Sequence, residues 1–436
     1  EFDIGWAPEL EGEFEGVERD LDVTAVDPAT AGRNAELCRI GAEALGAANR
    51  PLPRAAGRVA CCGTCPMGCA LDAKRAMHVS ELPRAAAAGA RIVAGARVTR
   101  VLVEGGRAAG VEACAAAGAG VAGAGQDAAG AAGAGPDAAG AAGAGADAAG
   151  AAGARPGAEA RAAGVEAGAG AAGAPFRVDA RAVVLAAGAL GTPELLLRQG
   201  IAGRSGHLGR HLRVQPACWV GARHPGEAVR GWDGVMQSWG VGEWADRGLF
   251  LEATFSPLPF GAHWMPGAGP AFAERVERYG EMAVVGVHLA DRSEGRVRVR
   301  GGQLRVAYRL TRDDAATLAF GIARAAAIHF ASGAGEVYPQ VAGAGILRPG
   351  EERGIEERRV RPAELRLEAF HPMGTARMGD EPSGSVVGPD GEVHDVPGLF
   401  VADASVLPTA LGANPMLTIM AVARHTARGL AERLAY

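Results

Sequence analysis

Two polar residues near the end of the chain could together bind and deprotonate a hydroxyl group. His371 stands in a glycine-containing loop that runs Phe370-His-Pro-Met-Gly-Thr-Ala-Arg-Met-Gly379. An imidazole can accept a proton near neutral pH because its unperturbed pKa is about 6.5. Asn414 directly precedes Pro415 and could hold the same hydroxyl oxygen by donating a hydrogen bond without titrating. Taken singly, His371 would be a loop histidine bonded to backbone and Asn414 a plain helix cap, so the prediction requires them to share one cavity.

The elements expected around these residues would hold them in place. Residues 398–405 predict a short apolar strand that ends at Asp403, whose carboxylate could bind a ligand hydroxyl or cap the next turn. Asn414 and Pro415 predict the N-cap and first position of a final helix. Thr192 and Pro193 predict a second such helix start, after a buried strand over 182–188.

Three stretches resemble the glucose–methanol–choline (GMC) family of flavin-dependent alcohol oxidases and dehydrogenases. They are the His371 loop, the run Leu-Phe-Val-Ala-Asp-Ala-Ser…Pro-Thr…Asn-Pro-Met-Leu-Thr-Ile near the end, and Ala-Ala-Gly-Ala-Leu-Gly-Thr-Pro-Glu-Leu-Leu-Leu…Gly-Ile at 186–201. The resemblance implies a two-lobed, FAD-linked α/β fold with an FAD-binding lobe and a substrate lobe of mixed β-sheet and helices. It also implies that His371 removes the hydroxyl proton, that Asn414 holds the substrate oxygen, and that hydride passes to flavin N5.

The resemblance further assigns residues to FAD. Asp403 would bind a ribityl hydroxyl, and the backbone of Val98 would meet the adenine. The helix beginning at Pro415 would stabilise the negative charge of the reduced ring through its partly positive N-terminus. The other residues expected at the cofactor are Gly188, Ala404, Asn414 and Met416.

A cysteine-rich stretch narrows the resemblance to one branch of the family. Cys61-Cys-Gly-Thr-Cys65-Pro-Met-Gly-Cys69 precedes a predicted helix and strand, as in the long-chain fatty alcohol oxidases that it resembles. Cys62, Cys65 and Cys69 could instead bind zinc or an iron–sulfur cluster. Because no second paired-cysteine motif exists, we expect packing cysteines or a local disulfide, and no metal site.

The domain organisation follows from composition and motif position. We expect an N-terminal partial region (1–57), an FAD-lobe segment with the Cys-rich loop and a β-meander (58–114), a Gly/Ala insertion (115–174), an FAD-lobe strand–helix segment (175–216), the substrate lobe (217–365) and a C-terminal catalytic and FAD-binding segment (366–436). Within the substrate lobe, strands are expected at 282–289, 296–300 and 304–310, and a helix at 313–330. A ten-residue repeat makes the insertion nearly all Gly and Ala, so it should be disordered, and its GxGxxG matches at 118–123 and 168–173 are chance.

The start of the sequence offers a second reading of the whole chain. No strand–GxGxxG–helix unit precedes residue 58, so the incomplete FAD-binding lobe is expected to lack its dinucleotide-binding part. The competing hypotheses are therefore an inactive, truncated remnant and, less favoured, a Cys-cluster metal-binding module. The formal net charge of −5 predicts neither a nucleic-acid partner nor binding to an acidic membrane, and no apolar run predicts a transmembrane segment.

The predicted reaction has a small-molecule alcohol as its substrate. A long-chain or hydrophobic primary alcohol is the first choice, with a sugar acid or sterol behind it. The electron acceptor is expected to be oxygen, a quinone or another electron carrier.

Overall fold

The computed structural model describes residues 10–56, 65, 68–69, 71–115, 165–167, 175–255 and 257–435. The chain divides into two compact units. The first comprises Glu1–Arg75, Val101–Gly110 and Asp179–Tyr436, and the second comprises Ala76–Arg100 and Val111–Val178. The residues with predicted catalytic roles all belong to the first unit.

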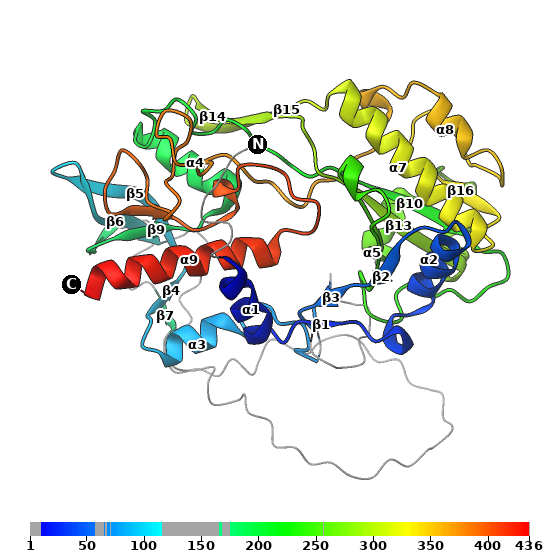
Figure 1. The fold of residues 1–436 in the computed structure, drawn as a ribbon, viewed down its shortest axis with the longest axis horizontal. Helices are drawn as coiled ribbons and strands as arrows, with labels where there is room; N and C mark the ends of the chain where they lie inside the picture. Colours follow the sequence, from blue (N-terminus) through cyan, green and yellow to red (C-terminus); the bar gives the residue numbers. More distant parts are fainter. Residues whose placement is uncertain are drawn as a thin grey trace, which may run out of the picture. The chain divides into compact units, whose positions relative to one another are not determined.

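The largest sheet of the first unit has six strands and lies on the right in Figure 1. Its strand order is β16-β10-β13-β12-β11-β2, with β2 at Asn49–Pro51, β10 at Ala217–Arg223, β11 at Trp239–Val241, β12 at Leu249–Ala253, β13 at Met282–Leu289 and β16 at Glu336–Tyr338. Every neighbouring pair in this sheet is antiparallel. The prediction of a mixed sheet is therefore wrong, and the predicted N-terminal region supplies the edge strand β2.

Both faces of this sheet are covered. Helices α2 (Arg33–Ala44) and α7 (Arg312–Ala331) pack on one face, where their apolar side chains join those of the sheet in the main core. An aromatic cluster that includes Phe255, Trp264 and Tyr338 forms a second core. All eight residues of β13 are consequently buried, as expected of a central strand. The predicted strand at 282–289 and the predicted helix at 313–330 are confirmed.

A second group of elements in the first unit carries the C-terminal segments. Strand β9 (Val183–Leu185) pairs in parallel with β17 (Leu399–Val401), and helix α4 (Gly188–Gln199) follows β9 directly. Helix α9 (Met416–Ala435) lies beside α1 (Glu11–Asp20), as Figure 1 shows. Arg424 binds Asp20 and Glu13, and Arg428 binds Glu13, so ion pairs join the two ends of the chain.

The start of α4 differs from the prediction. The helix begins at Gly188, so Thr192 and Pro193 lie inside it and not at its N-terminus. Pro193 has no N–H to donate to the carbonyl of Ala189 four residues earlier. The Thr375 hydroxyl donates to that carbonyl instead, at 2.7 Å. Tertiary contacts thus replace the missing helical hydrogen bond, which a local cap signal does not reveal.

The β-meander prediction holds for the hairpin of β5 (Ala96–Glu104) and β6 (Arg107–Ala115). Gly105 and Gly106 form its two-residue turn with φ of 58° and 80°, the positive values that a type I′ turn requires. Strand β8 (Pro175–Asp179) completes this three-stranded sheet. In the second unit, β4 (Ile92–Ala94) pairs in parallel with β7 (Val165–Ala167), so part of the segment expected to be disordered forms a strand. The two GxGxxG matches lie outside the described residues.

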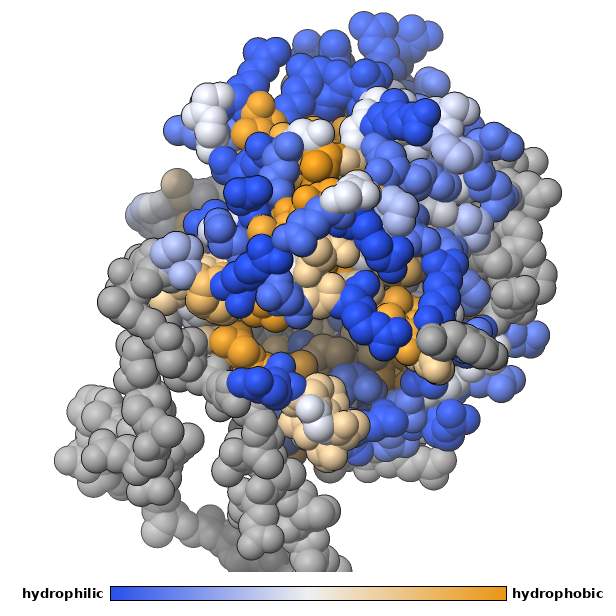
Figure 2. Space-filling model, turned by 90° about the vertical axis from the view of Figure 1, so that its left-hand side faces the viewer, coloured by the Kyte–Doolittle hydropathy of each residue, from blue (hydrophilic) through white to orange (hydrophobic). Residues whose placement is uncertain are grey.

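The remaining elements are short. They are β1 (Thr24–Ala25), β3 (Pro53–Arg54), α3 (Glu81–Ala87), α5 (Leu258–Gly261), α6 (Pro270–Glu277), β14 (Gly295–Arg300), β15 (Gln303–Tyr308) and α8 (Arg353–Glu357). Figure 2 shows one face of the molecule, on which hydrophilic residues surround separate apolar patches. Among the described residues, no helix combines the length and the apolar character needed to cross a membrane.

Candidate active site

A buried carboxylate lies at the centre of the candidate site. Glu252 on β12 is 1% exposed and accepts hydrogen bonds from three side chains. The donors are His288 Nε2 at 3.0 Å, Gln237 Nε2 at 2.7 Å and Asn414 Nδ2 at 3.3 Å. Arg54 donates to Gln237 Oε1 at 3.0 Å and so extends the network. Burying a carboxylate without hydrogen-bond partners would cost much free energy. The three donors therefore stabilise Glu252 in the protein interior.

The strand register explains why Glu252 and His288 meet. Glu252 lies opposite Gly286 in the β12–β13 pair, and residues two apart on a strand share a face. His288 is thus the diagonal neighbour of Glu252. Gly286 has no side chain between them, and a Cβ there would lie 3.3 Å from His288 Nε2. The absence of that Cβ lets the imidazole reach the carboxylate.

Both residues with predicted catalytic roles border this Glu252–His288 pair. The rings of His288 and His371 have centroids 6.1 Å apart, and the Asn414 carboxamide contacts Glu252 directly. Three buried atoms of the cluster, His288 Nδ1, His371 Nδ1 and Asn414 Oδ1, have no hydrogen-bond partner among the described residues. Such atoms call for a polar ligand or water between them.

Burial and charge set the protonation of the cluster. Burial is the main reason that the pKa of His371 falls to about 4; His288 contributes to the decrease, and Glu252 opposes it. Burial raises the pKa of Glu252, but His288, Gln237 and Arg54 outweigh burial and leave that pKa below its ordinary value. At neutral pH the site therefore holds a neutral His371 beside an ionised Glu252.

Backbone contacts fix the loop that carries His371. Met373 and Arg213 exchange two backbone hydrogen bonds of 3.0 and 2.9 Å. Gly374 adopts φ of 89°, and a Cβ there would lie 2.5 Å from the carbonyl oxygen of His211, so only glycine fits. The glycine of this motif is thus needed for the close approach of two backbones.

The loop before Asn414 is fixed by one glutamine. Gln215 Nε2 donates to the carbonyls of Leu411 and Ala413, at 2.9 and 3.1 Å. Helix α9 begins at Met416, and its first hydrogen bond runs from Ile419 N–H to the Pro415 carbonyl. The prediction that Asn414 caps this helix is wrong, because its carboxamide turns to Glu252 and its Oδ1 accepts no helical N–H. A charged acceptor competes successfully with the neutral cap.

Asp403 organises the end of β17. Its carboxylate accepts from Gly188 N–H at 2.9 Å, from the Thr192 hydroxyl at 2.5 Å and from Ser405 N–H at 2.8 Å. The last contact is the cap of the turn that begins at Ala404. These bonds join Asp403, Gly188 and Ala404, three of the residues expected at FAD, into one local structure. Val98 lies on β5 in the second unit, with its side chain exposed.

Aromatic side chains stand next to His371. Phe370 is 53% exposed, and its ring centroid lies 6.4 Å from His371 and 6.5 Å from Trp219. His263 lies 5.8 Å from Trp219 and contacts the carboxylate of Glu368. An exposed apolar ring beside a polar pair could contact the part of a ligand that extends away from His371.

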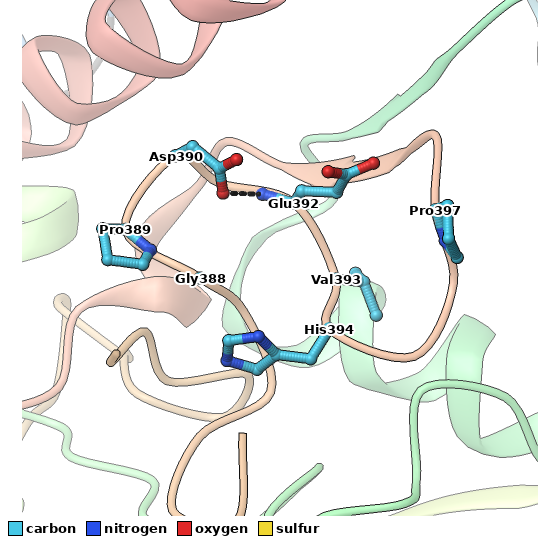
Figure 3. Close-up of a pocket in the computed structure, with 7 residues that line it drawn as sticks. All are labelled: Gly388, Pro389, Asp390, Glu392, Val393, His394 and Pro397. Carbon is cyan, nitrogen blue, oxygen red and sulfur yellow. Dashed lines mark hydrogen bonds between the residues drawn. The ribbon is translucent and has the colours of Figure 1, made fainter. Parts of the chain in front are cut away.

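A separate pocket lies in the loop from Gly388 to Pro397 (Figure 3). In it, Glu392 N–H donates to Asp390 Oδ1 at 3.0 Å, while Arg433 binds both carboxylates. His394 Nε2 lies 2.8 Å from the Ser385 hydroxyl, which also contacts two backbone carbonyls. The hydroxyl therefore donates to a carbonyl and accepts from His394, so His394 does not activate it as a nucleophile.

The cysteine cluster is only partly described. Cys61 and Cys62 lie outside the described residues, whereas Cys65 and Cys69 are half-buried and Lys74 N–H contacts the Cys69 sulfur at 3.4 Å. In the described part of the chain, no group of three or more His, Cys, Asp or Glu side chains gathers as a metal site would require.

Comparison with known proteins identifies the family of this chain. Residues 4–129 and 156–217 match the N-terminal GMC oxidoreductase domain, and residues 291–423 match the C-terminal one. The chain belongs to the GMC oxidoreductase family. Because the N-terminal match begins at residue 4, the expectation that the N-terminal part is missing is not supported.

Several relatives share parts of the sequence. An uncharacterized GMC-type oxidoreductase of Mycobacterium tuberculosis is 34% identical over 97% of this chain and 59% of its own length. A long-chain-alcohol oxidase of Arabidopsis thaliana is 28% identical over 54% of this chain and 35% of its own length. A C-glycoside 3-oxidase of Arthrobacter globiformis is 51% identical over 15% of this chain and 13% of its own length. The chain thus spans less than two thirds of the length of these relatives.

A solved structure supports the fold alone. The crystal structure of pyridoxine 4-oxidase from Mesorbium loti aligns with a TM-score of 0.51 and 17% identity, over 94% of this chain and 72% of its own. The α/β GMC fold is therefore confirmed.

The family implies FAD, and the described residues fit its reactive half. His371 Nδ1 and Asn414 Oδ1 are buried without partners, and Met416 at the start of α9 is exposed. A helix N-terminus leaves backbone N–H groups free to bind an anionic edge. The sequence motifs did not predict Glu252 and His288, which lie beside Asn414 and His371. The only sequence signal was a charged residue inside the apolar run Leu249-Phe-Leu-Glu-Ala253.

Proposed function

We propose that this GMC oxidoreductase oxidises an alcohol to a carbonyl compound with FAD, using His371 as the base. The supporting observation is the group of buried, unpartnered atoms contributed by His371, His288 and Asn414. A substrate hydroxyl placed there would donate its proton to an imidazole nitrogen, and its oxygen would accept from the Asn414 carboxamide. FAD, when bound, supplies the hydride acceptor. Asp403, Gly188, Ala404, Pro415, Met416 and the backbone of Val98 are proposed to hold FAD.

The Asn414 carboxamide is oriented for this role. Glu252 can only accept hydrogen bonds when ionised, so the amide nitrogen must face it. The second N–H of that nitrogen and the unpartnered Oδ1 are left for the substrate oxygen and its proton. Fixing both groups before the substrate arrives reduces the entropy lost in the reaction.

We propose a small-molecule alcohol as substrate and oxygen, a quinone or another electron carrier as acceptor. Similarity to long-chain-alcohol oxidases supports a hydrophobic primary alcohol. The exposed Phe370 beside Trp219 would contact an apolar chain or the face of a ring.

A ring alcohol is the second candidate. The Glu368–His263 pair next to Trp219 offers hydrogen bonds that a plain alkyl chain would not use. The short but high identity to a C-glycoside 3-oxidase points the same way. Comparing 1-dodecanol with a phenolic C-glycoside as reductants separates the two.

The test is anaerobic flavin reduction by the FAD-loaded chain, followed as loss of flavin absorbance after mixing with these alcohols. We expect His371→Ala to lower the rate constant by about 10² to 10⁴, the range for removing a general base. His78→Ala, an exposed histidine on another unit, is the matched control and should keep the wild-type rate. Unchanged reduction in His371→Ala would refute the role of His371. Failure of the folded chain to bind FAD would favour the inactive-remnant hypothesis.

A further inference from the structure

His288 has the geometry of a histidine that is held and supported by a carboxylate. Its ring is buried, and its Nε2 lies 3.0 Å from the equally buried Glu252 Oε1. Because an ionised carboxylate only accepts, Nε2 carries the proton, and in the neutral ring Nδ1 keeps its lone pair. That Nδ1 has no partner among the described residues. A carboxylate that orients one nitrogen leaves the other as a base and stabilises the imidazolium that forms.

His371 lacks such support. Its Nδ1 is buried without a partner in the described part of the chain, and burial followed by His288 lowers its pKa to about 4. A proton that it takes from a substrate is therefore held only briefly. The ring centroids of His371 and His288 lie 6.1 Å apart, so the two imidazoles are neighbours in the cluster.

We propose that the Glu252–His288 pair receives the proton that leaves the alcohol hydroxyl during oxidation. This inference rests on the proposed function. The O–H bond breaks, and its proton ends on His288 Nδ1. The proton reaches that nitrogen either through His371 or directly from the substrate oxygen. The C–H bond breaks with its two electrons, which leave as hydride to FAD, and the C=O bond forms. His288 then carries a positive charge beside the negative Glu252, so no unbalanced charge is left in the protein interior.

The groups around the pair are suited to this role. Arg54 and Gln237 face Glu252 from the side of β11, and Asn414 faces it from the loop before α9. Cys38 on α2 faces it with a thiol whose pKa burial raises to about 12, so the thiol stays neutral. With these neighbours Glu252 stays ionised, and His288 is the imidazole hydrogen-bonded to it.

The variants Glu252→Gln and His288→Gln test the inference in the FAD-loaded chain. Each keeps the side-chain volume, and His288→Gln keeps a donor for Glu252. We expect the rate constant of anaerobic flavin reduction to fall about 10²-fold in each, with little change in the half-saturating alcohol concentration. The rate in both variants should also rise with pH, because solvent must now take the proton. Cys38→Ala removes a buried group that faces Glu252 but breaks none of its hydrogen bonds, and should behave as wild type.

A second measurement uses the wild-type chain and so does not depend on the variants folding. Nitrogen NMR of the labelled histidines should show that the neutral His288 ring carries its proton on Nε2 and not on Nδ1. The opposite tautomer would overturn the inference, as would wild-type rates and pH profiles in both folded Gln variants. If His371→Ala abolishes flavin reduction while the Gln variants retain it, only this inference fails. If His371→Ala leaves reduction intact, the proposed function fails first.

Discussion

At the scale of single residues, the site depends on how Glu252 uses its two oxygens. One oxygen binds His288 and Gln237, and the other binds Asn414. The carboxylate thereby fixes the orientation of an amide and the tautomer of a ring at the same time. The two groups that face a substrate are thus set by a residue that does not itself reach the surface.

The protonation of His371 leads to a prediction on pH. Its pKa is lowered by burial to about 4, so it is already unprotonated, and competent as a base, throughout the range above about pH 5. The second-order rate constant for flavin reduction should fall only below that range, as His371 takes up a proton. Stopped-flow rates from pH 4 to 8 measure this dependence. A fall centred near the ordinary histidine value of about 6.5 would contradict the burial of His371.

At the scale of elements, the sequence predicted individual strands and helices better than it predicted the contacts between them. The strand at β13, helix α7 and the tight hairpin have strong local signals, namely an apolar run, a Thr311 cap and a Gly-Gly turn. The motif loops likewise predicted roles for His371 and Asn414, which the structure places near one another around Glu252 and His288. Glu252 contacts side chains from β13 and from the loop before α9. These contacts depend on strand register and on residues far apart in sequence. No local pattern contains that information.

Position 286 on β13 tests this arrangement. Replacing Gly286 with Ala would place a Cβ 3.2 Å from Thr254 Cγ2 and 3.3 Å from His288 Nε2, so His288 must move by a few tenths of an ångström. We expect flavin reduction to slow about tenfold, because small displacements of reacting groups are costly. The free energy of unfolding should change by less than about 1 kcal/mol. Glycine is unfavourable within a strand, so the gain from replacing it offsets the cost of the crowding. Urea unfolding and flavin reduction measure the two effects, and wild-type kinetics would show that His288 tolerates the shift.

At the scale of the whole molecule, the Glu252–His288 pair and the main core share one sheet. Glu252 lies between Leu251 and Ala253, which belong to that core, and His288 lies between two core residues in the same way. The site is therefore built on rigid strands and completed by two loops. Such a division suits a reaction in which fixed groups must meet a substrate with little rearrangement.

Two further histidines in the first unit should make the stability of the protein depend on pH. His224 and His329 are buried with ring centroids 6.2 Å apart, and both nitrogens of His224 lack hydrogen-bond partners among the described residues, with Nδ1 at 3.9 Å from Glu227 Oε2. Burial, with a smaller contribution from His224, lowers the pKa of His329 to about 3. Burial also lowers the pKa of His224 to about 4, opposed by Glu227 and assisted by Arg33.

Both rings are thus neutral when folded but take up protons near pH 6.5 when unfolded, so their contribution is complete above that pH and is lost as the pH falls toward 4. Each histidine should reduce the free energy of unfolding by about 1.4 kcal/mol per pH unit across that interval. His224→Phe removes one titrating group and two unpartnered nitrogens, so it should be more stable than wild type at pH 5 and lose stability less steeply. Urea unfolding from pH 7 to 4.5 measures the slopes, with His78→Ala as the exposed-histidine control. Equal slopes in wild type and His224→Phe would mean that His224 does not stay neutral in the folded protein.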